Sequence, residues 1–109
     1  MNLSNQEELV LLSIGMLHPE GYAYGVKQQI KEESGSGISL GTIHTILYRL
    51  ENERLVKSRM GGSSNKRGGR SKRLYTLTAK GYSLVKEISK VRQSMWEKMS
   101  LDKMMLDAI

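Results

Sequence analysis

Residues 39–53 read SLGTIHTILYRLENE. Ser39 is one of the residue types that cap helix N-termini, and apolar residues follow it at the spacing of one helical face. That face comprises Leu40, Ile43, Ile46, Leu47 and Leu50, and the opposite face carries Thr42, His44, Thr45, Tyr48, Arg49 and Asn52. The stretch predicts a helix to about Glu53. Its apolar side is expected to dock on a core, while its other side presents polar and cationic groups suited to base edges and phosphates.

The chain after this helix has the pattern of a β-hairpin. Two strand-like stretches, residues 55–60 and 73–77, flank a glycine-rich turn at 61–69. The cations in and beside the turn are Lys66, Arg67, Arg70, Lys72 and Arg73. Cations among glycines can follow a phosphate backbone or enter a minor groove, so we expect this tip to contact nucleic acid. A solvated turn without a partner is the alternative interpretation.

Two helices are predicted upstream. Residues 5–17 are so dense in apolar side chains that a mostly buried helix is expected, and it must end before Pro19 because the residue preceding a proline is pushed out of the helical region. Val26 and Ile30 lie one turn apart with charged and amide residues opposite, which predicts a short amphipathic second helix. The run Ser34-Gly35-Ser36-Gly37 ends that helix.

A last helix is predicted from Ala79 towards the C-terminus, with Thr78 as its cap. Apolar residues recur along it in a coiled-coil-like stripe that needs a partner. We expect this stripe, flanked by Trp96, to form a dimer interface, and its members are Leu84, Ile88, Val91, Met95 and Met99. Methionines crowd the C-terminal end, which is compatible with a small-molecule effector pocket, but dimer packing is the favoured interpretation.

The order helix, helix, helix, hairpin, helix predicts a mainly α (α+β) fold, namely a winged helix-turn-helix with a long C-terminal dimerisation helix. We expect a DNA-binding domain over residues 1–78 and a dimerisation helix over 79–109. A chain of 109 residues can bury one small core. Self-association is therefore expected to add stability.

The positive charge is concentrated in one part of the chain. Lys and Arg number 17 against 11 acidic residues, which gives a net charge of +6. Ten of these cations lie between Glu53 and Glu87, where there is no acidic residue, so the remainder of the chain is net acidic. A polycationic segment on an acidic body favours a polyanionic partner, with nucleic acid first and anionic lipid second. A basic face that only confers solubility is the alternative.

Several classes of function lack their chemical requirements. There is no cysteine, which excludes disulfides, thiolate zinc sites and cysteine nucleophiles. His18 and His44 do not form a metal-binding pair, and no phosphate-cradling loop is present, so we expect no metal, no cofactor and no enzymatic activity. No stretch approaches the roughly 20 apolar residues of a membrane span, and the N-terminus lacks an export signal. We therefore expect a cytoplasmic protein that does not bind membranes.

Short motifs in the chain resemble the PadR family of bacterial transcriptional regulators. They are Tyr24-Gly25, Glu33-Ser34-Gly35, Ser39-x-Gly41-Thr42-Ile43-His44, Tyr48-Arg49-Leu50-Glu51 and Gly68-Gly69-Arg70-Ser71-Lys72-Arg73-x-Tyr75-x-Leu77-Thr78-x-x-Gly81. The resemblance covers roughly residues 8–99. It implies a homodimer whose last helices pack on the partner's first helix. It also implies two recognition helices and two wings on a pseudo-palindromic operator, with repression that a small molecule relieves. His44 and Thr45 stand where the commoner family pattern has Tyr and Pro, and the chain resembles the short-tailed branch.

Together these features predict a sequence-specific regulator that binds double-stranded DNA as a homodimeric repressor. The residues expected in the groove are Thr42, His44, Thr45, Tyr48 and Arg49. One alternative is a protein that uses the same cations to bind RNA or the nucleoid without sequence selection. Another is a protein-interaction module whose apolar C-terminal helix captures a different partner.

Overall fold

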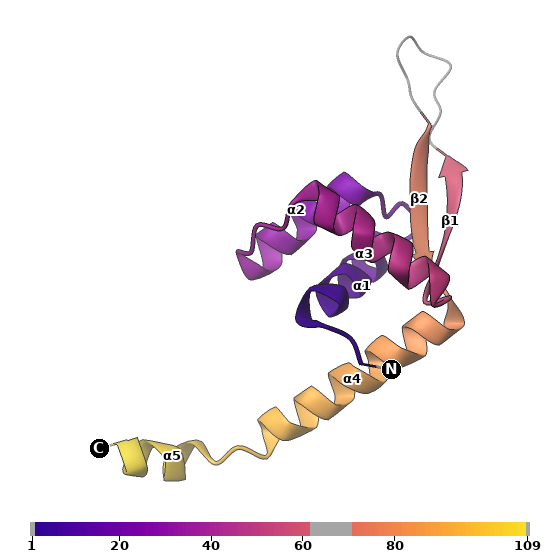
Figure 1. The fold of residues 1–109 in the computed structure, drawn as a ribbon. Helices are drawn as coiled ribbons and strands as arrows, with labels where there is room; N and C mark the ends of the chain where they lie inside the picture. The colour runs from indigo at the N-terminus through magenta and orange to yellow at the C-terminus, as the bar shows by residue number, and fades with distance from the viewer. Residues whose placement is uncertain (1, 62–70, 109) are drawn as a thin grey trace.

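The computed structural model describes residues 2–61 and 71–108 of the chain. Its elements follow in the order α1 (Asn5–Leu17), α2 (Ala23–Ser34), α3 (Leu40–Asn52), β1 (Val56–Gly61), β2 (Lys72–Leu77), α4 (Ala79–Glu97) and α5 (Leu101–Ala108). Three helices precede a two-stranded antiparallel hairpin, and further helices follow it (Figure 1). The predicted fold class, a mainly helical winged helix-turn-helix, is confirmed. The predicted domain boundary at residue 78 stays a prediction.

The helix boundaries follow from local capping. Ser39 accepts a hydrogen bond from the backbone N–H of Thr42 at the start of α3, and Thr78 accepts one from Gly81 at the start of α4. Gly35 ends α2 in the left-handed conformation, with a φ of 75°, which glycine adopts without the steric cost that a Cβ would bring. All three predicted helix signals are confirmed.

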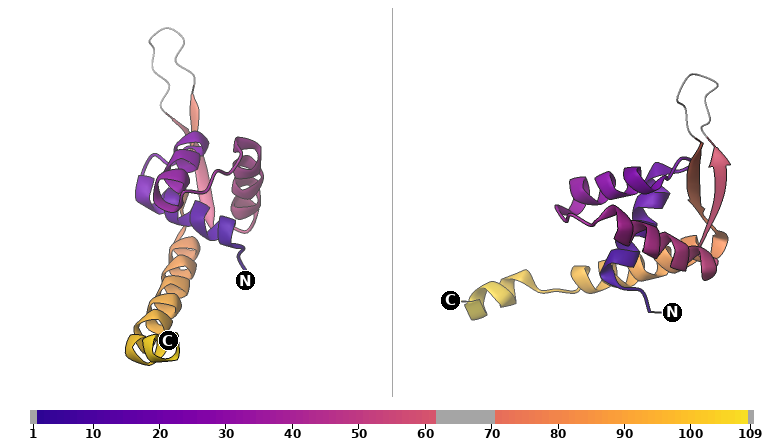
Figure 2. Two further views of the ribbon diagram at one scale, coloured as in Figure 1. Left: turned by 90° about the vertical axis from the view of Figure 1, so that its left-hand side faces the viewer. Right: turned by 45° about the horizontal axis from the view of Figure 1, so that its top comes forward.

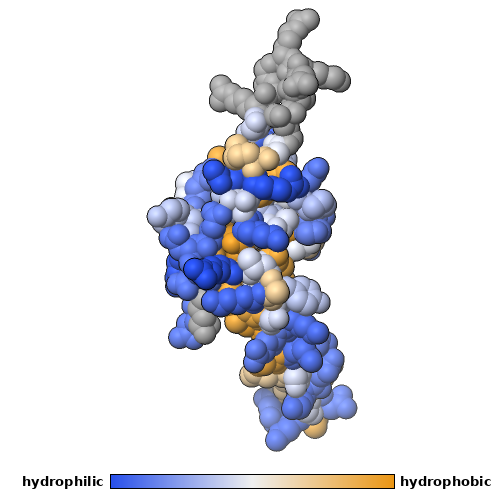
Figure 3. All heavy atoms as spheres, turned by 90° about the vertical axis from the view of Figure 1, so that its right-hand side faces the viewer, coloured by the Kyte–Doolittle hydropathy of each residue, from blue (hydrophilic) through white to orange (hydrophobic). Residues whose placement is uncertain are grey.

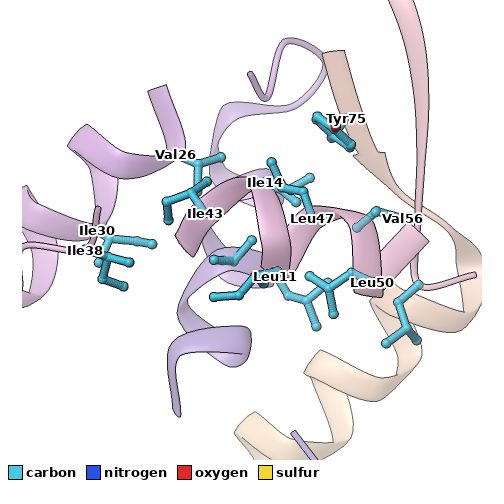
Figure 4. Close-up of a cluster of buried hydrophobic side chains, with 13 residues drawn as sticks. Leu11, Ile14, Val26, Ile30, Ile38, Ile43, Leu47, Leu50, Val56 and Tyr75 are labelled. Atoms are coloured by element: carbon cyan, nitrogen blue, oxygen red, sulfur yellow. The ribbon is translucent and has the colours of Figure 1, made fainter. Parts of the chain in front are cut away.

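The core lies where the first three helices meet the base of the hairpin. Its fully buried side chains include Ile14 of α1, Val26 of α2 and Leu47 of α3. Figure 4 shows Ile14 and Leu47 lying close together between α1 and α3, with Tyr75 and Val56 reaching in from the hairpin. Burying a side chain of this size contributes about 1.5–3 kcal/mol. The core therefore holds α3 by one face and leaves the other face free.

The hairpin is joined to the helices by backbone hydrogen bonds. β1 and β2 pair with Val56 opposite Leu77, and the Tyr75 N–H donates to the Gly21 carbonyl at 2.7 Å. β1 begins and ends one residue later than the predicted stretch 55–60, and β2 begins one residue earlier than the predicted stretch 73–77. Ladder pairing, rather than side-chain alternation, decides where each strand begins.

The first turn of α4 is packed directly on the hairpin base. A Cβ on Gly81 would lie 2.0 Å from the Leu55 carbonyl oxygen, so only glycine permits this approach. From there α4 runs away from the hairpin and carries α5 clear of the helical body (Figure 2). The Cα radius of gyration is 17.3 Å, against roughly 13 Å for a compact chain of this length. The C-terminal part of the chain is therefore an extended arm.

The prediction of one helix continuing through Met99 is wrong. Residues 98–100 separate α4 from α5, and the Met104 N–H donates to the Ser100 carbonyl in the first turn of α5. Serine competes with the backbone for hydrogen bonds and so favours helix starts over helix interiors, while Asp102 is well placed in the first turn of α5. Met99 thus lies between two helices and not on the α4 stripe.

The prediction that the first helix is mostly buried is wrong for one side of α1. Val10, Leu11 and Ile14 are buried, but Leu12 and Met16 are exposed. The other helices of the winged domain cover the first side, whereas α4 covers the second only in part. An apolar side of α1 therefore stays open to solvent in the single chain.

Leu40 also departs from its predicted place on the buried face of α3. It is the first residue of α3, and its side chain is exposed. The start of α3 extends past the core, so the Leu40 side chain is not buried although it follows the apolar periodicity of the helix.

In the part of the chain that the structure describes, no helix combines the length and apolarity needed to span a bilayer.

Candidate nucleic-acid interface

The outward face of α3 presents a row of hydrogen-bonding side chains. The Thr42 hydroxyl accepts from the Ser39 hydroxyl at 2.9 Å, which leaves its own proton free to donate outward. The Thr45 hydroxyl donates to the Gly41 carbonyl at 3.1 Å, so it faces a partner as an acceptor. Tyr48 is 70% exposed. Three of the predicted groove residues therefore lie on one free helical face.

His44 lies at the edge of a cleft between the helices and the hairpin. The cleft has a volume of about 330 Å³ and is lined by Tyr22, Tyr24, Leu40, His44, Lys72, Arg73 and Tyr75. The Lys72 ammonium stands 4.3 Å from the centroid of the Tyr22 ring, within cation–π range. The structure thus brings the start of α3 and the first residues of β2 together around a cationic, tyrosine-lined hollow.

Arg49 shares the outward face of α3 but is tethered to α1. Its Nη1 forms an ion pair with Oε2 of Glu7, with 2.8 Å between the two atoms. The Glu7 side chain is 4% exposed and the Arg49 side chain 54% exposed. The ion pair therefore holds Arg49 against a buried carboxylate, while about half of its side chain stays open to solvent.

Arg73, predicted as a phosphate contact, is directed across the hairpin. Its Nη1 donates to the Ser58 hydroxyl at 2.9 Å, and that hydroxyl donates to Glu51 of α3. Burial raises the pKa of the neighbouring Tyr75 above its ordinary value of 10.0; the charge of Glu51 adds to this rise and that of Arg73 opposes it. Tyr75 is thus a neutral phenol near pH 7, and Arg73 links β2 to β1 and α3.

The remaining predicted wing cations, Lys66, Arg67 and Arg70, lie outside the described residues. In the described part of the hairpin, Lys57 and Arg59 add exposed positive charge that the sequence prediction did not single out. The Arg59 guanidinium donates to the Pro19 carbonyl at 3.3 Å. Alternation along β1 could have flagged both as solvent-facing.

Three further contributors were not predicted: Tyr22 and Tyr24 beside the cleft and Glu7 behind Arg49. The pattern Ser4-x-x-Glu7 is a capping-box signature, so a structural role for Glu7 was available from the sequence. Nothing local indicates its pairing with Arg49, since the partners are distant in sequence. Across residues 2–61 and 71–108, no three acidic or histidine side chains gather in a way that could hold a metal ion.

The predicted dimer residues divide into two groups. Leu84 and Ile88 are half-buried within the same chain, Leu84 against the core and Ile88 beside Leu12 of α1. The other predicted members are exposed, namely Val91, Met95, Trp96 and Met99. The free part of the stripe therefore begins about where α4 leaves the body.

An open apolar groove adjoins this stripe. It has a volume of about 760 Å³ and lies between α1 and α4, lined in part by Leu12, Met16, Tyr82 and Val85. Figure 3 shows apolar atoms gathered in a seam between hydrophilic side chains on the side of the molecule at the right of Figure 1. A single chain thus leaves apolar surface exposed on both its body and its arm.

A comparison with protein-family models matches residues 11–87 to the transcriptional regulator PadR-like family. The chain belongs to this family. The matched segment includes α2, α3, both strands and the first half of α4, which are the elements that form and support the polar face described above. The sequence-based resemblance to PadR regulators is confirmed.

Solved structures of PadR-like proteins share this fold. A PadR family transcription regulator from Clostridium difficile R20291 is 27% identical, with a TM-score of 0.69 over 87% of this chain and 93% of its own. A PadR-like transcription factor from Bacteroides fragilis is 25% identical, with a TM-score of 0.68 over 84% of each chain. A PadR-like regulator from Bacillus cereus, at 23% identity and a TM-score of 0.70 over 84% of each chain, agrees in fold. A search of curated proteins found no match.

Family membership makes this protein a transcriptional regulator, a class that acts by binding DNA. It also confirms the prediction that the protein is not an enzyme, because the PadR-like family consists of regulators.

Proposed function

We propose that this PadR-like regulator is a homodimeric repressor that reads a pseudo-palindromic operator with α3 and the wing of each protomer. The exposed polar face of α3 is the observation that carries the proposal. Thr42, Thr45 and Tyr48 offer a donor, an acceptor and a phenol on a helix whose other face is anchored in the core. A helix with these properties fits the major groove, where each base pair presents its own pattern of donors and acceptors.

The cations of the hairpin supply the sequence-independent part of binding. Lys72 stands at the turn end of β2, beside the start of α3, so it can meet a phosphate next to the groove that α3 enters. Lys66, Arg67 and Arg70 extend the same role along the wing. Neutralising each phosphate contributes about −0.9 to the slope of log K against log salt, so binding is expected to weaken steeply as salt rises.

The exposed apolar surface of the C-terminal arm supports dimerisation through it. Val91, Met95 and Trp96 are exposed on the second half of α4, and Leu12 and Met16 leave one side of α1 open. Monomeric soluble proteins rarely leave large contiguous apolar patches uncovered. To read two half-sites one DNA turn apart, two arms packed on one another and on the partner's α1 would have to hold the two copies of α3 roughly 34–36 Å apart.

A small-molecule effector fits the junction of α4 and α5. A cavity of about 380 Å³ there is lined by Gln93, Trp96, Glu97, Met99, Leu101 and Met104. An indole and adaptable thioethers suit a planar, lipophilic cation, with Glu97 as its counter-charge. Titrating such cations should quench Trp96 fluorescence and release DNA together, and a compound that does only one of these does not act at this site.

Selection of duplexes from a random-sequence pool by the purified protein tests the proposal. A palindromic consensus bound by a dimer, with shuffled duplex and RNA as weak competitors, is the expected result. Equal competition by RNA and shuffled DNA would instead favour the sequence-independent alternative. Adding the protein to in vitro transcription from a promoter carrying the consensus should lower transcript yield, as expected of a repressor acting on DNA in the cytoplasm.

A further inference from the structure

Glu7 is a buried acid with two partners. It lies in the first turn of α1, and its side chain is 4% exposed. Its Oε1 accepts from the Ser4 backbone N–H at 2.8 Å, and the Ser4 hydroxyl accepts from the Glu7 N–H at 3.2 Å, which completes a capping box. Its Oε2 forms an ion pair with Nη1 of Arg49 at 2.8 Å. The capping box holds the carboxylate still, so the carboxylate in turn holds the guanidinium.

Arg49 extends this contact to the outward face of α3. It follows Tyr48 directly and lies one helical turn after Thr45, and its side chain is 54% exposed. A guanidinium has five donors in a planar fork, and Glu7 contacts one of its nitrogens. The exposed part of the Arg49 side chain leaves donors accessible on the surface where α3 would meet DNA.

We propose that Glu7 is a positioning residue for DNA recognition, which directs Arg49 to base edges and away from phosphates. The inference rests on the proposed function. A free arginine is a mobile cation that any phosphate attracts, whereas an arginine paired with a carboxylate has its charge compensated and its fork fixed. Binding to base edges depends on correctly placed hydrogen-bond donors, while binding to phosphates depends mainly on net positive charge. The pair therefore raises the ratio of cognate to random binding.

The neighbouring residue supplies a matched control. Glu8 lies in the same turn of α1 and accepts from Arg92 of α4, also at 2.8 Å. Replacing Glu8 with glutamine changes the charge of the protein as much as replacing Glu7 does, and it also frees one arginine. That arginine belongs to α4, so the two variants separate the position of the freed side chain from the added charge.

The experiment compares wild type, Glu7→Gln and Glu8→Gln on two duplexes: one selected from a random pool by the wild-type protein and a shuffled version of it. Gln at this position also completes a capping box, so Glu7→Gln should keep the helix start. Two freed copies of Arg49 in a dimer should steepen the salt slope on shuffled DNA by about 1.8, which is about twelve-fold more affinity lost between 50 and 200 mM salt. Cognate preference should fall about five-fold or more. Glu8→Gln should change neither the affinity lost between 50 and 200 mM salt nor the cognate preference by as much as two-fold.

A double-mutant cycle with Arg49→Gln assigns the effect to the pair. In the Arg49→Gln background, Glu7→Gln should no longer tighten binding to shuffled duplex or steepen the salt slope. If Glu7→Gln still tightens binding to shuffled duplex without Arg49, or if Glu8→Gln tightens it equally, the inference is overturned. An unchanged slope and unchanged preference in a folded Glu7→Gln protein would overturn it as well.

Further measurements keep the inference separable from folding and from the proposed function. Thermal unfolding of each variant comes first. If Glu7→Gln does not fold, Arg49→Lys replaces it. This variant keeps a positive charge opposite the Glu7 carboxylate but lacks the planar guanidinium, so it should lose cognate preference while its salt slope stays unchanged. Retained preference would overturn the inference. Failure of the wild-type protein to prefer any selected duplex would overturn the proposed function itself.

Discussion

Replacing Met95 with alanine should weaken the proposed dimer without unfolding the protomer. Met95 lies near the distal end of α4 with 66% of its surface exposed in the single chain. Burying a whole methionine side chain contributes about 1.5–3 kcal/mol, so covering this fraction is worth about 1–2 kcal/mol. A two-fold interface buries the residue twice, which brings the loss to about 2–4 kcal/mol for the dimer. The dimer Kd should then rise by about thirty-fold to several hundred-fold.

Sedimentation equilibrium over a concentration series measures this change. Alanine is the best helix former, so α4 should persist and circular dichroism should be unchanged. Lys90→Ala is the control, since Lys90 is exposed on α4 about 140° around the helix axis from Met95. DNA binding by the Met95→Ala protein should recover at concentrations that restore the dimer. A Kd within three-fold of the wild-type value, or an equal shift in Lys90→Ala, would refute the reasoning that places Met95 in the interface.

Three other substitutions test the surface of the winged domain and its junction with the arm. Tyr48→Ala should leave the unfolding free energy within about 0.5 kcal/mol, because the side chain is 70% exposed, yet weaken cognate binding in a mobility-shift assay by about 1–3 kcal/mol; a loss of stability instead would contradict a role at the groove. Lys72→Gln should make the salt slope shallower by about 0.9 per protomer and remove the contact with Tyr22, and an unchanged slope would mean that Lys72 meets no phosphate. Gly81→Ala would place a Cβ 2.0 Å from the Leu55 oxygen, so thermal unfolding should show a loss of at least about 1–3 kcal/mol, and wild-type stability would contradict the close approach.

Features set by short-range patterns were predictable. Ser39 marks the start of α3 because its side-chain oxygen accepts a hydrogen bond from a backbone N–H three residues later. Gly35 marks the end of α2 because a residue without a Cβ readily adopts the left-handed conformation. Ile43 and Leu47 mark the buried face of α3 because helical geometry repeats every 3.6 residues. These signals correctly predicted which face of α3 is free for recognition.

Features that depend on how elements dock were missed. The break at residues 98–100 was hidden by an apolar spacing that continues across it, although Ser100 is a local helix-start signal. Leu12 and Met16 were expected to be buried because periodicity counts apolar residues but does not reveal which side a later helix covers. They are exposed because α4 lies beside α1 but leaves an open groove between the two helices, which Leu12 and Met16 line.

The sequence by itself determined the succession of elements, the concentration of positive charge around the hairpin and membership of the PadR-like family, because each depends on residue type and spacing along the chain. Only the tertiary structure decided the partners of the cations. Arg49 meets Glu7, Arg73 meets Ser58, and Lys72 meets a tyrosine ring. The physical reason is that a long side chain reaches whichever acceptor the packing of distant elements brings within a few ångströms, and nothing in the local sequence records which one that is.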